Sequence, residues 1–298
     1  RVLKGDEWIR DMIFPARLFL KSVGISTIRY ADLPSSREPL LLNKLEQYQV
    51  RDFLLQQDQQ IEPSLMLDRL PVGKTQQATW LSSQQEQQLL QERLLQLGKE
   101  LTPVTQQSLQ FSPELIIHIS VPQASHSSYW LSLQSSSASE KRRAQIWLEY
   151  LLWLAYLNDD ARSPELERIV IFSNKTLKFS GLSSTKAREY LQFWFKAWEI
   201  GQKQPLVLPA ELLMKKEWQW AENEQGKMTI VEMPELLKAW NNSYESAKPL
   251  ASDESSLLHQ DWQFILQDQD PDLALQRCCH DFAHALYAPI HQHLEWVK

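Results

Sequence analysis

A run of three cations in the middle of the chain could contact a phosphate. Lys141, Arg142 and Arg143 stand at the start of a helix that the sequence predicts over residues 140–157. The N-terminus of a helix presents unpaired backbone N–H groups and favours anions, so these side chains and the helix end could bind a DNA phosphate together. The same cations are also compatible with a solvated first turn in which Glu140 offsets their charge.

Two tryptophans beside two lysines could stack on DNA bases. Aromatic rings next to cations are typical of proteins that bind single strands. Tryptophan is also frequent in cores and at protein interfaces, so packing is the alternative explanation for this pair. The residues that the sequence offers for DNA contact are Lys141, Arg142, Arg143, Lys215, Lys216, Trp218 and Trp220.

The stretch around the same helix has the order strand, turn and helix, on which a metal-dependent nuclease could be built. Such an enzyme binds Mg²⁺ through acids on neighbouring strands, and a lysine two positions from an acid helps to activate water. Ser128–Gln134 contains no Asp, Glu or Lys, and Leu115–Val121 contains no acid. Glu140 and Lys141 are adjacent, one position too close for this spacing. The sequence therefore predicts no catalytic residue and no metal site.

Two other functions stay open at this point. Acids that follow the helix, Asp159, Asp160 and Glu165, could build an active Mg²⁺-dependent nuclease from displaced positions. The chain could instead be an adaptor module that has nothing to do with DNA.

Motifs for other chemistries are incomplete. Gly73–Lys74–Thr75 lacks the earlier glycine of a phosphate-binding loop, so an ATPase is not expected. His280 and His284 have the i, i+4 spacing of a helix, but no acid completes a zinc-protease motif. We interpret them as histidines on a helix surface.

A mixed sheet flanked by helices must position these residues. The apolar helix over 140–157 has Glu149 as its only charge from Ile146 to Leu157, so neighbours must cover it on most sides. We expect 115–121 to form a hairpin with 128–134, and 168–172 to form one with 176–179. Further predictions are a strand over 25–30, a loop over 246–256 and helices over 1–24 (broken at Pro15), 41–56, 82–98 and 184–199.

Composition limits the class of protein. The chain has 298 residues, 12 tryptophans and a formal net charge of −6, which argues against a free-standing DNA binder held by bulk charge. Cys278 and Cys279 are adjacent and fit a reducing cytoplasm. No signal peptide or membrane span is expected. Because the sequence starts with Arg1 rather than Met, we expect a piece of a longer chain.

The expected organisation is one domain over residues 1–298. It would have a helical N-terminal part (1–110), an α/β core (111–210) and a helical C-terminal part (211–298).

Several short motifs, in order along the whole chain, give it a family resemblance. It resembles the C-terminal domain of RecC, the gamma subunit of bacterial exodeoxyribonuclease V (RecBCD), and its opening helix is similar to that of the RecB-like nucleases. The motifs are Phe14–Leu20, Pro39–Leu54 with Leu45, Tyr48 and Gln49, Leu70–Pro71 with Gly73, Gln145 with Trp147–Glu149, and Pro205–Pro209.

The resemblance implies a restriction-endonuclease-like fold that has lost its active site. It implies a bacterial, cytoplasmic scaffold in double-strand break repair and recombination, with no cofactor of its own; partner subunits would use Mg²⁺ and ATP. The implied partners are the beta (RecB) and alpha (RecD) subunits, together with double- and single-stranded DNA inside the complex, and no membrane. The Chi-reading surface belongs to other domains of that family, so no residue is assigned to it.

Overall fold

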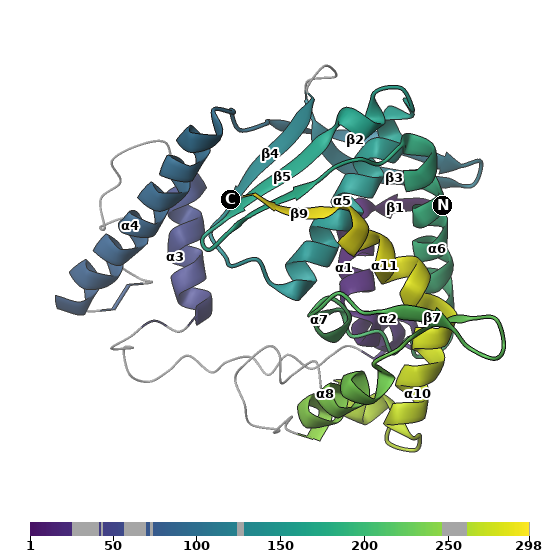
Figure 1. Ribbon diagram of the computed structural model, residues 1–298. Coiled ribbons are helices and arrows are strands. Elements are labelled where there is room, and N and C mark those ends of the chain that lie inside the picture. The colour runs from purple at the N-terminus through teal and green to yellow at the C-terminus, as the bar shows by residue number, and fades with distance from the viewer. Residues whose placement is uncertain are drawn as a thin grey trace.

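Two sheets and one long helix between them organise the structure, a computed structural model (Figure 1). The structure describes residues 1–25, 42, 44–56, 70–71, 74–123, 128–245 and 261–297. The four-stranded sheet has the order β4 (Tyr129–Gln134), β5 (Glu167–Phe172), β6 (Thr176–Phe179) and β9 (Leu294–Val297). Helix α5 (Glu140–Leu157) joins β4 to β5, which run parallel. This strand–helix–strand unit is the centre of the fold.

The second sheet has the order β1 (Val2–Lys4), β3 (Leu115–Pro122) and β2 (Val104–Ser112). The predicted hairpin between 115–121 and 128–134 is therefore wrong, because β3 pairs with β1 and β2 while β4 pairs with β5. The chain just before β2 connects the sheets, since Thr102 N–H donates to the Leu131 carbonyl at 3.0 Å. The second predicted hairpin is confirmed, with β5 and β6 antiparallel.

Helix α5 lies between the sheets and is buried from Ala144 to Ala155 on almost every side. The Ser139 hydroxyl caps its first turn by accepting from the Arg142 N–H, and Asn158 ends it in the left-handed conformation at φ 50°. The helices that cover it include α1 (Gly5–Ile13), α6 (Ser184–Gly201) and α7 (Ala210–Leu213). Pro15 separates α1 from α2 (Pro15–Ser22), as predicted.

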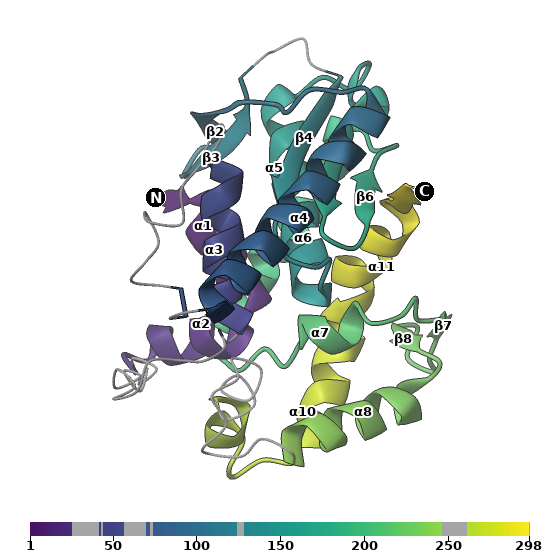
Figure 2. The ribbon, with the colours of Figure 1, turned by 90° about the vertical axis from the view of Figure 1, so that its left-hand side faces the viewer.

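Helix α4 (Lys74–Leu97) covers the face of the four-stranded sheet opposite α5, and Figure 2 shows it lying across β4 and β6. Leu90 packs there with Leu131, Ile169 and Ile171. Helix α4 starts eight residues before the helix predicted over 82–98, and α3 (Lys44–Gln56) packs against α4. Among the described side chains of α3, Val50 and Leu54 are buried, whereas the motif residue Gln49 is exposed.

The C-terminal part contains strands as well as the predicted helices. β7 (Trp220–Glu222) and β8 (Met228–Ile230) form a hairpin, followed by α8 (Met233–Glu245), a short helix over 261–265 and α10 (Pro271–Cys278). A π-helical turn (Cys279–Ala283) leads into α11 (His284–His293) and then into β9. The strands are therefore not confined to the α/β core that was expected over residues 111–210. β1 and most of β2 precede residue 111, and β9 follows residue 211.

Some predictions fall outside the described residues: residues 26–30 of the strand over 25–30, the loop over 246–256, and the motif positions Pro39 and Gly73. Along the described part of the chain, no helix combines the length and the apolar character that a bilayer crossing requires.

Candidate functional site

A buried arginine lies on the α5 face of β4 and β5, beside the strand on which the sequence offered no metal-binding acid. The Arg168 guanidinium donates to Glu149 on α5 at 3.0 Å, to the Ser132 hydroxyl at 2.9 Å and to the Ile169 carbonyl at 3.0 Å. It also lies 4.1 Å from the ring centroid of Trp130. Burial lowers the pKa of Arg168, and the Glu149 carboxylate opposes that shift. A fixed positive charge thus joins the helix to the sheet.

The α4 face of the same sheet carries two carboxylates, Glu167 beside the Tyr129 strand and Glu295 on the opposite edge strand, β9. Glu167, the register partner of Tyr129, contacts Lys99 at 2.6 Å and Lys178 at 3.4 Å. Lys178 also contacts Glu295 on β9 at 2.8 Å. Both carboxylates are therefore compensated by ammonium groups. The described residues contain no group of three or more His, Cys, Asp or Glu side chains that could hold a metal ion.

The pKa of Glu167 gives this network a pH dependence. Burial alone would raise this pKa, but the hydrogen bond and charge of Lys99, together with Lys178, hold it below its ordinary value of 4.5. The pKa of Glu167 is lower in the folded state than in the unfolded state. The ionised carboxylate therefore stabilises the fold at neutral pH, and this stabilisation is lost as the pH falls through the folded-state pKa.

We expect Glu167→Gln to reduce the loss of unfolding free energy on going from about pH 7 to about pH 3. Chemical denaturation of both proteins across this range measures the effect. Glu165→Gln, at an exposed position two residues away, is the matched control and should follow the parent protein. Identical pH profiles for Glu167→Gln and the parent would contradict the assignment.

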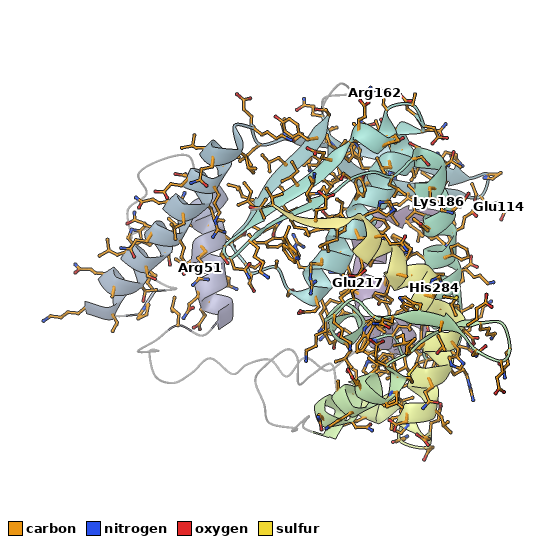
Figure 3. All side chains as sticks on the ribbon, viewed as in Figure 1. Arg51, Glu114, Arg162, Lys186, Glu217 and His284 are labelled. Carbon is orange, nitrogen blue, oxygen red and sulfur yellow. The ribbon has the colours of Figure 1, made fainter. Side chains whose placement is uncertain are left out.

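The displaced acids that could have served a nuclease lie in the turns after α5. The Asp159 carboxylate accepts hydrogen bonds from the backbone N–H groups of Ala161 and Arg162. Figure 3 labels Arg162 at the top of the molecule. Asp160 accepts from the backbone N–H of Thr185 at 2.7 Å and from its hydroxyl, and these hydrogen bonds lower the pKa of Asp160. Glu165 is exposed. Asp159 and Asp160 thus shape the connections around α6.

The basic run at the start of α5 is partly engaged within the protein. Lys141 lies 3.6 Å from Glu211 and Arg143 lies 3.0 Å from Glu140. Arg142 has no ion pair within the described residues, and its Nε is buried without a hydrogen-bond partner. Arg142 is therefore the member of this run whose charge is least compensated.

The tryptophan–lysine group after α7 is divided between core and surface. Trp218 is buried beneath the Lys216 ammonium, which lies 4.4 Å from its ring centroid, so the core explanation holds for this residue. Lys216 is paired with Glu235 at 2.8 Å. Trp220 is half-buried and packs edge-on against His284 at 5.1 Å, while Lys215 is exposed.

This group is separate from the acids after α5, because Figure 3 places Glu217 below the sheet and Arg162 above it. The histidines are likewise dispersed along the C-terminal helices. Burial lowers the pKa of His284, and His293 stacks on Trp147 at 5.7 Å. DNA contact by the residues named from the sequence stays a prediction.

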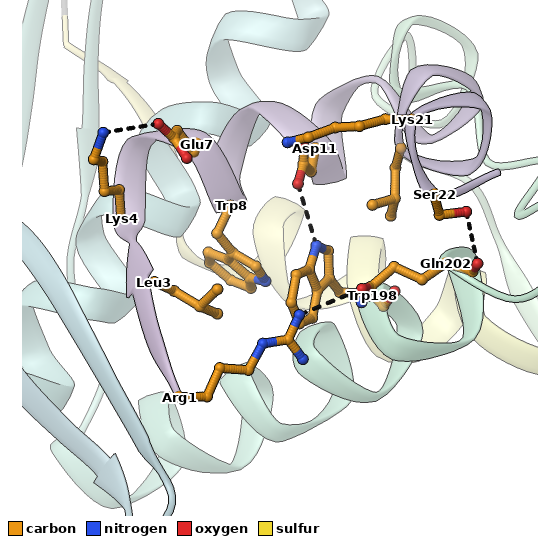
Figure 4. Close-up of a pocket in the computed structure, with 11 residues that line it drawn as sticks. Arg1, Leu3, Lys4, Glu7, Trp8, Asp11, Lys21, Ser22, Trp198 and Gln202 are labelled. Carbon is orange, nitrogen blue, oxygen red and sulfur yellow. Dashed lines mark hydrogen bonds and ion pairs between the residues drawn. The ribbon is translucent and has the colours of Figure 1, made fainter. Parts of the chain in front are cut away.

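A cavity of about 270 Å³ opens between α1 and α6 (Figure 4). The Trp198 indole N–H donates to the Asp11 carboxylate at 3.4 Å, and the Arg1 guanidinium lies 4.3 Å above the Trp198 ring. Burial raises the pKa of Asp11, against the opposing charge of Lys21. This cavity could not be predicted from the sequence, because Asp11 and Trp198, which line it, are 187 positions apart.

The ion pair between Arg168 and Glu149 was not predicted from the sequence either. The signal was present, because Glu149 is the only charge within a long apolar run and Arg168 opens an apolar strand. A lone charge in a buried segment requires a partner.

Comparison with known proteins adds one finding. A family model described as the RecC C-terminal domain matches residues 1–225. No curated protein matches the chain.

Proposed function

The chain belongs to the RecC C-terminal domain family, and from this premise we propose that it is a non-catalytic part of the gamma subunit of exodeoxyribonuclease V. In this role it packs against partner subunits and guides DNA strands that their motors have separated. The process served is double-strand break repair, recombination and degradation of DNA ends. The family match over residues 1–225 is the observation that carries the proposal.

The absence of catalysis is supported by how the described carboxylates are used. On the α5 face, Glu149 is bound to Arg168, and on the α4 face Glu167 is bound to Lys99 and Lys178. Asp159 and Asp160 accept hydrogen bonds from neighbouring backbone N–H groups. A Mg²⁺ ion needs several oxygen ligands that are free to face it, and these side chains are already committed elsewhere.

A nuclease-like ancestry is supported by the central unit. The antiparallel pair β2–β3 precedes a parallel β4–α5–β5 unit, and helices cover both faces of the four-stranded sheet. Metal-dependent nucleases of the restriction-endonuclease class place their acids on such strands. Here β4 contains no acid, and Glu167, the acid on β5, is bound to Lys99 and Lys178.

The partners that we propose are the beta (RecB) and alpha (RecD) subunits, in the bacterial cytoplasm. Those subunits would use Mg²⁺ and ATP, and this chain would bind neither. DNA would be contacted inside the complex by the basic and aromatic residues named from the sequence, with Arg142 and Lys215 as the least compensated cations.

We expect the purified chain to leave linear DNA intact in the presence of Mg²⁺ or Mn²⁺, because the described residues contain no group of acids that could hold the metal and activate water. Gel analysis of end-labelled DNA measures this, with EDTA as the control for contaminating nuclease. Metal-dependent cleavage that is abolished by changing Asp159, Asp160 or Glu165 would instead establish an active nuclease.

The scaffold role has a separate test. The chain should co-purify with the beta subunit when the two are co-expressed. Failure to do so, with the chain folded, would favour an adaptor unrelated to this complex. Tight binding of duplex DNA at physiological salt would also contradict the proposal, because the chain's net charge of −6 does not favour it.

A further inference from the structure

An exposed tryptophan lies on the edge strand of the four-stranded sheet. Trp296 on β9 is 39% exposed, although large apolar residues of this sheet are otherwise mostly buried. Its register partner is Leu177, which faces the α5 side, so Trp296 lies on that side as well. β9 pairs with β6 on one edge, and no described strand pairs with its other edge. The ring is thus accessible at the margin of the fold.

Two cations from different elements lie over this ring. The Lys175 ammonium, in the turn between β5 and β6, is 4.6 Å from the ring centroid of Trp296. The Arg143 guanidinium, in the first turns of α5, is 5.8 Å from it. Lys175 is exposed and has no ion pair within the part of the chain that the structure describes. An exposed ammonium without a carboxylate can move from the ring to an anion.

More positive charge surrounds this group. Arg93 on α4 donates to the carbonyls of Phe172 and Ser173, at 2.7 and 3.0 Å, so its charge faces neutral oxygens. Arg142 on α5 likewise has no ion pair among the described residues. Glu140, paired with Arg143, is the carboxylate in ion contact with this group. Lys175, Arg93, Arg142 and Arg143 thus outnumber the carboxylate that pairs with them, on a chain whose net charge is −6.

The topology explains why these side chains meet. β4 and β5 are parallel, so the loops that follow them lie together beyond the carboxyl ends of the two strands. Ligands of α/β sheets commonly bind at this end of the sheet. The two loops are joined there, because Ser173 N–H donates to the Ser136 carbonyl at 3.2 Å and Ala138 N–H donates to the Asn174 side chain at 3.1 Å. The first turn of α5 begins beside them, and β9 adds Trp296.

We propose that Trp296, Lys175 and Arg143 form a binding site for single-stranded DNA. A base stacks on the Trp296 indole, and the Lys175 ammonium moves from the ring to an adjacent phosphate, with Arg143 contributing a second cation. An exposed indole beside the Lys175 ammonium, unpaired within the described residues, and the Glu140-paired Arg143 guanidinium suits a ligand that has both flat rings and negative charge. This site rests on the proposed function, since it gives the DNA-guiding role a location; Arg143 was a candidate DNA contact from the sequence, whereas Trp296 and Lys175 were not.

The test titrates the purified 298-residue chain into a fluorescently labelled oligothymidylate, longer than the roughly 4–16 nucleotides that one such groove covers. Anisotropy is followed at several salt concentrations. Trp296→Ala should weaken binding roughly fivefold or more at low salt, whereas Trp296→Phe should retain most of the affinity. Lys175→Gln should lower the slope of log K against log salt by about 0.7, the value for one phosphate contact on a single strand.

The matched controls lie on α6, across the molecule from the end of β9 in Figure 1. Phe193→Ala removes another exposed aromatic ring, and Lys196→Gln removes another exposed ammonium. Neither should change affinity or salt slope. Circular dichroism of each variant verifies the fold, and Lys175→Gln, in an exposed turn, tests the site without touching the core.

Three outcomes would overturn the site. If the chain binds the oligonucleotide but Trp296→Ala and Lys175→Gln behave like the controls, DNA is guided elsewhere and only this site fails. If Trp296→Ala leaves DNA binding unchanged but prevents co-purification with the beta subunit, the ring is a protein contact. If the chain binds no single strand at low salt, the site and the DNA-guiding role both fail, while the scaffold role is judged by co-purification.

Discussion

Replacing Glu149 with Leu should lower the free energy of unfolding by about 3–5 kcal/mol, because it leaves the Arg168 guanidinium buried without a counter-charge. The side chain of Arg168 is only 3% exposed, and that of Glu149 is 19% exposed. Transfer of an unpaired charge from water into such a site is strongly unfavourable. Urea denaturation of the variant and the parent chain measures the difference.

The double variant Glu149→Leu/Arg168→Met distinguishes the buried charge from lost packing. Replacing both members of a buried pair with apolar groups of similar volume is often neutral or even stabilising, so the double variant should be more stable than Glu149→Leu alone. Glu189→Gln, which removes the exposed Lys186–Glu189 pair on α6, is the control and should change stability by less than about 1 kcal/mol. A Glu149→Leu protein as stable as this control would show that Arg168 is solvated, contrary to the structure.

Replacing Trp147 with Ala should cost a similar amount, about 3–5 kcal/mol, by opening a cavity in the centre of the fold. Trp147 is fully buried on α5. Its ring packs against Phe179 at 5.4 Å and Tyr190 at 6.0 Å, and it stacks on His293 at 5.7 Å. One side chain thus joins the central helix to the sheet, to α6 and to the end of α11.

Trp147→Phe should be much less destabilising than Trp147→Ala. The indole N–H of Trp147 is buried without a hydrogen-bond partner among the described residues, so a phenyl ring loses volume but no described hydrogen bond. Phe193→Ala, at an exposed position on α6, should be nearly neutral. The same denaturation experiment ranks all three variants. Equal effects for Trp147→Ala and Phe193→Ala would contradict the central position of Trp147.

Helix α5 and the β5–β6 hairpin could be predicted because the residue pattern that indicates each of them lies within one short segment. The apolar run from Ile146 to Leu157 predicted a covered helix, and α5 has the predicted bounds, Glu140–Leu157. The short turn between 168–172 and 176–179 allowed only an antiparallel hairpin. The family was also predicted correctly from short motifs in the right order.

The pairing of β3 and β4 could not be predicted in the same way. Both strands are apolar and close in sequence, so a hairpin was the simplest expectation. In the structure, β3 takes β2 and the distant β1 as partners, which leaves β4 free to pair in parallel with β5. Strand β9 was not predicted either. It has only four residues and follows a helical region, so its alternation of apolar and polar residues is too short to indicate a strand.

The sequence by itself determined the family, the mixed α/β class, the buried central helix and the lack of acids on its preceding strand. Each of these depends on residue type and on spacing within one segment. Only the tertiary structure decided that Arg168 meets Glu149, that Glu167 lies between two lysines, and that Trp296 lies beneath Lys175 and Arg143. These contacts join residues between 11 and 153 positions apart, and a one-dimensional pattern carries no information about which of these side chains share a face of the sheet.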